Sequence, residues 1–89
     1  MERKEVYRIL DGERDYQNTV RKENERDARE DDEKSIADFI IYMEHTLNKA
    51  KTAVYQLNDE EALAMLRKVT ALGVAAGESF DFPERKMRG

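Results

Sequence analysis

The feature that most constrains this chain is the stretch from Ile36 to Leu57, where apolar residues recur at steps of three and four. Those residues are Ile36, Phe39, Ile40, Met43, Leu47, Ala50, Val54 and Leu57. Such steps keep the side chains on one side of a spiral with 3.6 residues per turn. At ~1.5 Å per residue, the stretch would form a helix about 33 Å long. We therefore predict an amphipathic helix over residues 36–57, against which the rest of the chain packs.

A short polar connection leads from this helix into a second apolar pattern. Asn58 can cap the next helix and Glu61 can close a capping box, as Ser35 and Asp38 can at the start of the first. The second pattern consists of Ala62, Leu66, Val69, Gly73 and Ala76. It predicts a helix over residues 59–76 that lies antiparallel to helix 36–57, because the connection is short. Gly77 is expected to stop it, and residues 77–89 to form an extended tail.

The N-terminal third of the chain has a helical part and a charged part. An apolar pattern near one face predicts a helix over residues 2–22. It consists of Val6, Ile9, Leu10, Tyr16 and Val20. Gly12 lies inside that pattern, so a kink or a break at this point is the alternative. Residues 21–34 contain twelve charged side chains out of fourteen. We expect this segment to be either a solvated helical extension or a linker, since nothing in it can be buried.

Composition limits the fold class and the kind of protein. The chain has 89 residues and no cysteine, so it forms one domain, residues 1–89, without disulfides. We predict an all-α three-helix bundle built on a long antiparallel helical hairpin. Because so short a chain buries a small share of its surface, we also expect it to form an oligomer.

The charge and hydropathy of the sequence limit the kinds of partner that the protein can bind. The net charge is −4 with 40% of residues charged, which disfavours direct nucleic-acid binding, since phosphate contact requires clustered Lys and Arg. No apolar run approaches the ~20 residues that span a bilayer, and no apolar run follows the first residues as in a signal peptide. We expect a soluble cytoplasmic protein with no membrane contact.

The sequence contains few residues of the kinds that form catalytic centres. The sequence has no glycine-rich phosphate loop, no Ser-His-Asp set and no Cys-His pair, and its one histidine, His45, has the character of a surface residue. Acidic residues that a helical bundle could gather remain the only candidate metal ligands. We expect no catalytic residue and no cofactor.

Three segments carry a resemblance to a known family. They are DGERDYQ at residues 11–17, FIIYMEH at 39–45 with LNKA at 47–50, and LRKVTALGVA at 66–75. In this order they resemble small phage-encoded proteins related to the all-α nucleoside triphosphate pyrophosphohydrolases of the MazG type. The resemblance implies an all-α scaffold that assembles as a dimer or tetramer, with sites between helices of different subunits.

The residues that match the family's metal motifs depart from them. The first motif is two adjacent glutamates with a third glutamate three residues after the second; Glu44 is kept, but His45 and Asn48 stand for the other two. In the second motif, a glutamate is followed three residues later by an aspartate, but Glu61 is followed by Ala64. Because neutral side chains lack the charge that holds Mg²⁺, the resemblance implies a scaffold that has lost hydrolysis.

The first functional hypothesis is a non-enzymatic helical binding or interaction protein, of phage type and in the host cytoplasm if phage-encoded. It would hold a host protein or a nucleotide-like ligand on an oligomeric scaffold. The candidate ligand-binding residues, basic for phosphates and aromatic for stacking, are Arg8, Arg14, Tyr16, Tyr42, Arg67 and Lys68. The candidate interaction surface, which lies off the main apolar stripe, is Ile41, Tyr42 and Tyr55.

The alternative is a Mg²⁺-dependent nucleoside triphosphate pyrophosphohydrolase of the MazG type. Its metal ligands would be Glu13, Glu44 and Glu61, with Asp59 or Glu60 able to replace the last. A purely structural helical adaptor is the third possibility.

Overall fold

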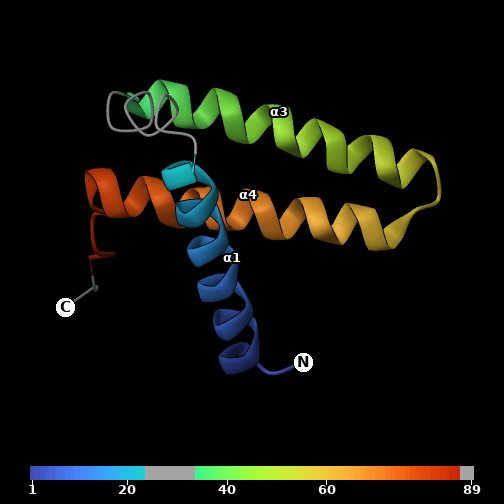
Figure 1. Ribbon diagram of the computed structural model, residues 1–89, viewed down its shortest axis with the longest axis horizontal. Helices are drawn as coiled ribbons and strands as arrows, with labels where there is room; N and C mark the ends of the chain where they lie inside the picture. Colours follow the sequence, from blue (N-terminus) through green and yellow to red (C-terminus); the bar gives the residue numbers. More distant parts are fainter. Residues whose placement is uncertain (24–33, 87–89) are drawn as a thin grey trace.

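The computed structural model describes residues 1–23 and 34–86 and is all-helical in these parts. Its helices, labelled as in Figure 1, are α1 (Arg3–Glu23), α3 (Ile36–Tyr55) and α4 (Asp59–Phe80). They pack against one another, which confirms the predicted all-α fold with three helices. The charged segment expected to be an extension or a linker falls mainly on residues 24–33, outside the described residues.

The helix that packs against both others is α4. It lies beside α3 in an antiparallel hairpin, and α1 crosses its C-terminal half (Figure 1). The N-terminal half of α1 projects beyond the hairpin. The prediction that the rest of the chain packs against residues 36–57 therefore holds for α4, whereas α1 packs on α4 instead of α3.

Apart from Phe39, the buried part of the hairpin consists of small side chains. The buried residues are Phe39, Thr46, Ala50 and Ala53 on α3, with Ala62 and Ala71 on α4. The Thr46 hydroxyl donates to the Tyr42 carbonyl at 3.1 Å, so its polar atom is satisfied inside the helix. Alanine and threonine allow two helix backbones to approach closely. As a result, only part of the predicted stripe on α3 is buried, and Ile40, Leu47 and Val54 are exposed.

The start of α3 is capped as predicted, whereas its end differs. Ser35 accepts from the Asp38 amide at 3.1 Å, and the Ser35 amide donates to the Asp38 carboxylate at 3.0 Å. The helix ends at Tyr55, two residues before the predicted boundary. Leu57 adopts a left-handed conformation with φ 59°. The helix therefore closes before the Leu57 side chain can join the apolar stripe.

The start of α4 confirms the predicted cap, although the capping box does not form. The Glu61 amide donates to the Asn58 side chain at 3.1 Å. The backbone amide of Asn58 donates instead to the Ala53 carbonyl at 2.9 Å. That amide closes the end of α3, so it is not left for Glu61 to satisfy.

At its other end, α4 continues through Gly77 to Phe80, so the predicted stop at residue 76 is wrong. A Cβ atom on Gly77 would lie 2.6 Å from the ring of Phe82. Gly77 therefore makes room for the returning tail, which begins at Asp81, rather than ending the helix. Phe80, expected in the tail, lies in the helix and packs edge-on against Phe39 with ring centroids 6.1 Å apart.

The first helix, α1, runs without interruption through Gly12, so the alternative of a break there is excluded. A Cβ atom at Gly12 would meet nothing within 4 Å, which shows that no close packing requires glycine at this position. Neither α1 nor the other two described helices combines the length and apolar character that crossing a membrane requires.

Candidate functional site

A groove of about 930 Å³ lies where α1 crosses the hairpin. This volume is in the range of small-molecule sites in proteins. All three helices and the residue before the α3 cap contribute to its lining, which consists of Glu13, Arg14, Tyr16, Gln17, Asn18, Val20, Lys34, Phe39, Tyr42, Ala64, Met65, Arg67, Lys68, Leu72, Ala75, Glu78 and Ser79.

The charge of this lining is opposite in sign to that of the whole chain. Among the described residues of the lining, four side chains are basic, namely Arg14, Lys34, Arg67 and Lys68, and two are acidic, Glu13 and Glu78. This described lining thus has an excess of two positive charges, whereas the full sequence has a net charge of −4. Since like-signed side chains in a concave site concentrate their field, this part of the surface favours an anion.

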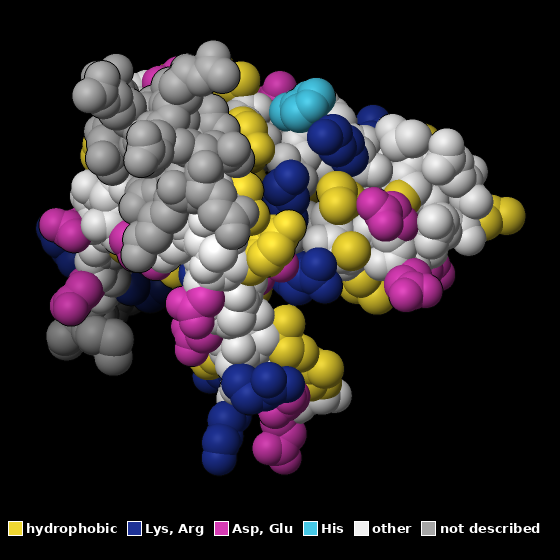
Figure 2. All heavy atoms as spheres, in the orientation of Figure 1, with side chains coloured by type: hydrophobic (Ala, Val, Ile, Leu, Met, Phe, Trp, Pro, Cys, Tyr) yellow, Lys and Arg dark blue, Asp and Glu magenta, His cyan; other side chains and the backbone are white. Residues whose placement is uncertain are grey.

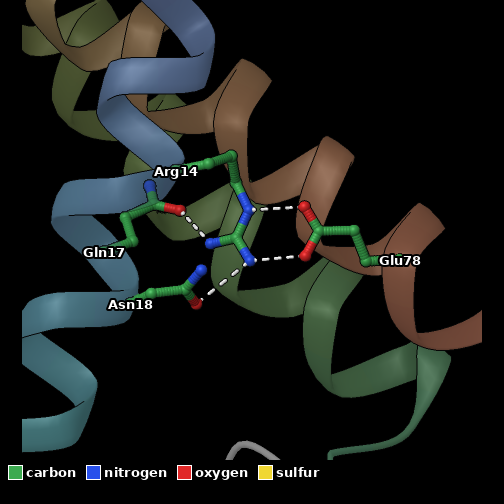
Figure 3. Close-up of polar contacts among 4 residues, drawn as sticks. All are labelled: Arg14, Gln17, Asn18 and Glu78. Atoms are coloured by element: carbon green, nitrogen blue, oxygen red, sulfur yellow. Dashed lines mark hydrogen bonds and ion pairs between the residues drawn. The ribbon is translucent and has the colours of Figure 1, made fainter.

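The Arg14 side chain of the groove bonds to three other side chains in the described part of the chain (Figure 3). Its Nε and Nη2 atoms donate to the two carboxylate oxygens of Glu78 on α4, at 3.1 and 2.7 Å. Its Nη1 and Nη2 atoms also donate to Gln17 and Asn18, at 3.0 and 3.3 Å. The side chain is 12% exposed. A two-pronged bond of this kind is strong and directional, so Arg14 holds α1 in a fixed register on α4.

Arg67 makes a simpler contact across the same two helices. Its Nε donates to a Glu13 carboxylate oxygen at 2.8 Å. Glu13 is next to Arg14 in the sequence, so α1 presents an acid and a base side by side to α4. On α4 their partners, Arg67 and Glu78, are eleven residues apart, or about 16 Å along the helix. The opposite polarity of the two pairs fixes the direction of α1, because reversing it would bring like charges together.

Aromatic rings form the α3 side of the groove. The Lys34 ammonium lies 4.9 Å from the centroid of the Tyr42 ring and 5.9 Å from that of Phe39. A cation over a ring face is held by the negative charge of that face. Tyr16, from α1, is an exposed ring on the same lining. The groove thus combines basic groups with rings on which a planar group could stack.

One buried donor in the lining lacks a partner in the part of the chain that the structure describes. The Nε2 atom of Gln17 is buried without an acceptor, while its Oε1 accepts from Arg14. Exchanging the two amide atoms would aim an N–H group at the guanidinium, so the Arg14 contact fixes this orientation.

The groove brings together five of the six predicted ligand-binding residues: Arg14, Tyr16, Tyr42, Arg67 and Lys68. Arg8 does not line it. Arg8 lies earlier on α1, where it bonds Glu5 within the same helix. Of the predicted interaction surface, Tyr42 therefore belongs to the groove, whereas Ile41 and Tyr55 are exposed elsewhere on α3.

The predicted metal ligands are not brought together. Glu13 pairs with Arg67, Glu44 is exposed on α3, and Glu61 lies in the first turn of α4. Among residues 1–23 and 34–86, no three side chains of the His, Cys, Asp and Glu types are grouped so that they could hold a metal ion.

The three described residues that accept hydrogen bonds from the Arg14 side chain were not predicted. Gln17 and Asn18 follow Arg14 at three and four residues, a spacing that places them beside it on a helix and could have revealed them. Glu78 is 64 residues from Arg14, and only the crossing of α1 over α4 brings it near.

Comparison with known proteins gives no further guide. No protein-family profile matches the chain, and no curated protein or solved structure is significantly similar to it.

Proposed function

We propose that this protein is a non-enzymatic helical binding protein that holds a nucleotide-like ligand in the groove, on a scaffold that associates with further copies. The observation that supports this best is that, among the described residues, four basic side chains and three aromatic rings line one groove. Phosphate groups need the first and a planar base can use the second. Of the two kinds of ligand expected from the sequence, this arrangement favours the nucleotide-like one.

The basic residues have different roles in this proposal. Arg14 uses its Nε and both terminal nitrogens in contacts within the chain, so it positions α1. Arg67 uses its Nε for Glu13, and its terminal nitrogens can donate to a phosphate. Lys68, half-buried in the lining, supplies a second point charge. The phosphates would thus be held from α4, and the base from Tyr16 or Tyr42.

The test is binding of a fluorescent adenine nucleotide, followed by anisotropy. Lys68→Ala should weaken binding about tenfold, since a hydrogen bond to a charged group contributes roughly 1.5–3 kcal/mol. The matched control is Lys4→Ala, which removes the same charge from an exposed site at the start of α1, outside the groove. Equal weakening by the two variants, or no binding by the unmodified protein, would contradict the proposal.

The same samples separate binding from hydrolysis. With Mg²⁺ present, we expect the nucleotide to remain intact and no pyrophosphate to appear. Pyrophosphate release that Glu44→Gln abolishes would instead support the alternative of a MazG-type pyrophosphohydrolase. A protein that binds no nucleotide but captures a partner through Ile41 or Tyr55 would support an interaction module.

A further inference from the structure

An exposed aliphatic row runs along α3 at a constant spacing of seven residues. It consists of Ile40, Leu47 and Val54, which are 59%, 48% and 53% exposed. Seven residues are almost two helical turns, so the three side chains form one line about 21 Å long. The Ile36 side chain, also exposed, lies near its start. An aliphatic line of this spacing is the surface that one helix offers to another.

The row lies on the opposite side of the hairpin from the groove. At 100° per residue on α3, the row is on one side of the buried Ala50, whereas the groove residue Tyr42 is on the other. On α4 the same geometry separates the groove residue Lys68 from three exposed aliphatic side chains. Those are Leu63, Leu66 and Val74. We call the four α3 residues and these three the hairpin face. Figure 2 shows the molecule from the side on which α1 crosses the hairpin, where hydrophobic side chains lie beside Lys and Arg side chains, so the hairpin face is turned away from the viewer.

The exposed area of the chain is larger than that of a folded monomer of its size. The chain exposes 7785 Å², against about 5,400 Å² expected for 10.4 kDa. Even half of the excess of about 2,400 Å² exceeds the roughly 800 Å² that each partner contributes to a stable interface. The radius of gyration, 14.7 Å, likewise exceeds the about 12 Å expected. The exposed area is therefore large enough for a stable interface with one further chain.

Charges beside the row match those of a second copy. Glu44 and Lys51 are exposed on one edge of the row, seven residues apart, and Leu47 lies between them. If two α3 helices pack antiparallel about a two-fold axis at Leu47, Glu44 of each copy faces Lys51 of the other. Ile40 then faces Val54. A surface that matches itself in this way is what a two-fold dimer requires.

We propose that the hairpin face is a dimer interface, in which two copies pack antiparallel through α3 about a two-fold axis at Leu47. The two hairpins then pack face to face as a four-helix bundle, and a groove remains open on each outer side. This interface specifies the association assumed above, but it does not depend on the groove binding any ligand.

The first test is the mass of the purified protein by sedimentation equilibrium. The unmodified chain should have about twice its 10.4 kDa mass. Leu47→Glu should sediment as a monomer, because the new carboxylate meets its own copy at the axis. Ile41→Glu is the matched control, since Ile41 is equally an exposed residue of α3 but lies off the hairpin face; it should remain dimeric. Far-UV circular dichroism shows that each variant is folded.

A charge exchange tests the register and not merely the presence of an interface. Glu44→Lys and Lys51→Glu should each weaken the dimer, because each places like charges opposite one another. The double variant should restore it. A monomeric unmodified protein, or dissociation by Ile41→Glu without dissociation by Leu47→Glu, would overturn the proposal. Failure of the double variant to recover would overturn the antiparallel register. Nucleotide binding by monomeric Leu47→Glu tests the groove separately.

Discussion

At the scale of single residues, the turn between α3 and α4 places Leu57 in a strained backbone conformation. The Leu57 amide donates to the Val54 carbonyl and the Asn58 amide to the Ala53 carbonyl, which satisfies the last carbonyls of α3. This pattern requires a left-handed residue, and at φ 59° leucine is strained by roughly 1–2 kcal/mol. Its side chain is 91% exposed and contributes little packing.

Leu57→Gly should therefore raise the free energy of unfolding by about 1 kcal/mol, since glycine adopts this conformation without strain. Urea denaturation measures the change. Lys49→Gly, at an exposed position inside α3 and off the hairpin face, is the control and should lower stability by about 1 kcal/mol. If both glycines destabilise the protein equally, the strain assigned to Leu57 is absent.

The stability of the fold depends on pH through the carboxyl group of Asp38, at the start of α3. The hydrogen bond from the Ser35 amide, with smaller contributions from the Ser35 side chain and the Lys34 charge, lowers the pKa of this carboxyl. Because this pKa is lowered on folding, the ionised Asp38 side chain stabilises the fold at pH values above its pKa in the unfolded chain. This stabilisation is lost as pH falls through the pKa of Asp38 in the folded protein. The urea midpoints of the unmodified protein and Asp38→Asn should therefore differ at neutral pH and converge below about pH 4. A constant difference would contradict this.

At the scale of elements, α1 depends on polar contacts for its place on α4. Arg14→Ala removes the bond to Glu78 and leaves Gln17 and Asn18 without their donor. We expect a loss of about 1–3 kcal/mol, seen as faster amide hydrogen exchange in α1 than in α3. Arg8→Ala is the control, because the Arg8 side chain is 69% exposed and its ion pair, with Glu5, lies within α1; it should change stability by less than about 1 kcal/mol. Uniform exchange across all helices would contradict this.

The sequence predicts those parts of the elements that local chemistry decides. The capping residues Ser35 and Asn58 act on amides three residues away, so their roles can be read from spacing. The rotation of α3 and the length of α4 cannot be predicted in this way. The face of α3 that is buried depends on the small residues of α4, and Gly77 stays helical because Phe82 returns over it.

At the scale of the whole molecule, the chain places two different surfaces on opposite sides of one hairpin. Five groove residues were named from the sequence because basic and aromatic side chains suit the nucleotide-like ligand that we propose. Their assembly was not predictable, because Arg14 and Glu78 meet only where α1 crosses α4. The same crossing leaves Arg8 outside the groove and pairs Glu13 with Arg67 instead of with other acids.

The electrostatic character of the groove predicts how binding responds to salt. Because the proposed contacts are between phosphates and the charged side chains of Arg67 and Lys68, nucleotide affinity should fall steadily as salt is raised. The dimer, held mainly by aliphatic contacts, should keep its mass over the same range. Anisotropy and sedimentation on one series of samples measure both. Salt-independent nucleotide affinity would indicate binding by stacking alone.

The most direct measurement of the central claim is an NMR titration of the isotope-labelled protein with ATP, following backbone amide shifts. The ligand should shift amides of the groove residues Gln17, Tyr42 and Lys68, and leave those around Arg8 and Lys51 unchanged. It should do so in the unmodified protein but only weakly in Lys68→Ala. Shifts confined to the hairpin face, or none at saturating ATP, would contradict the assignment of the groove as a nucleotide-like ligand site.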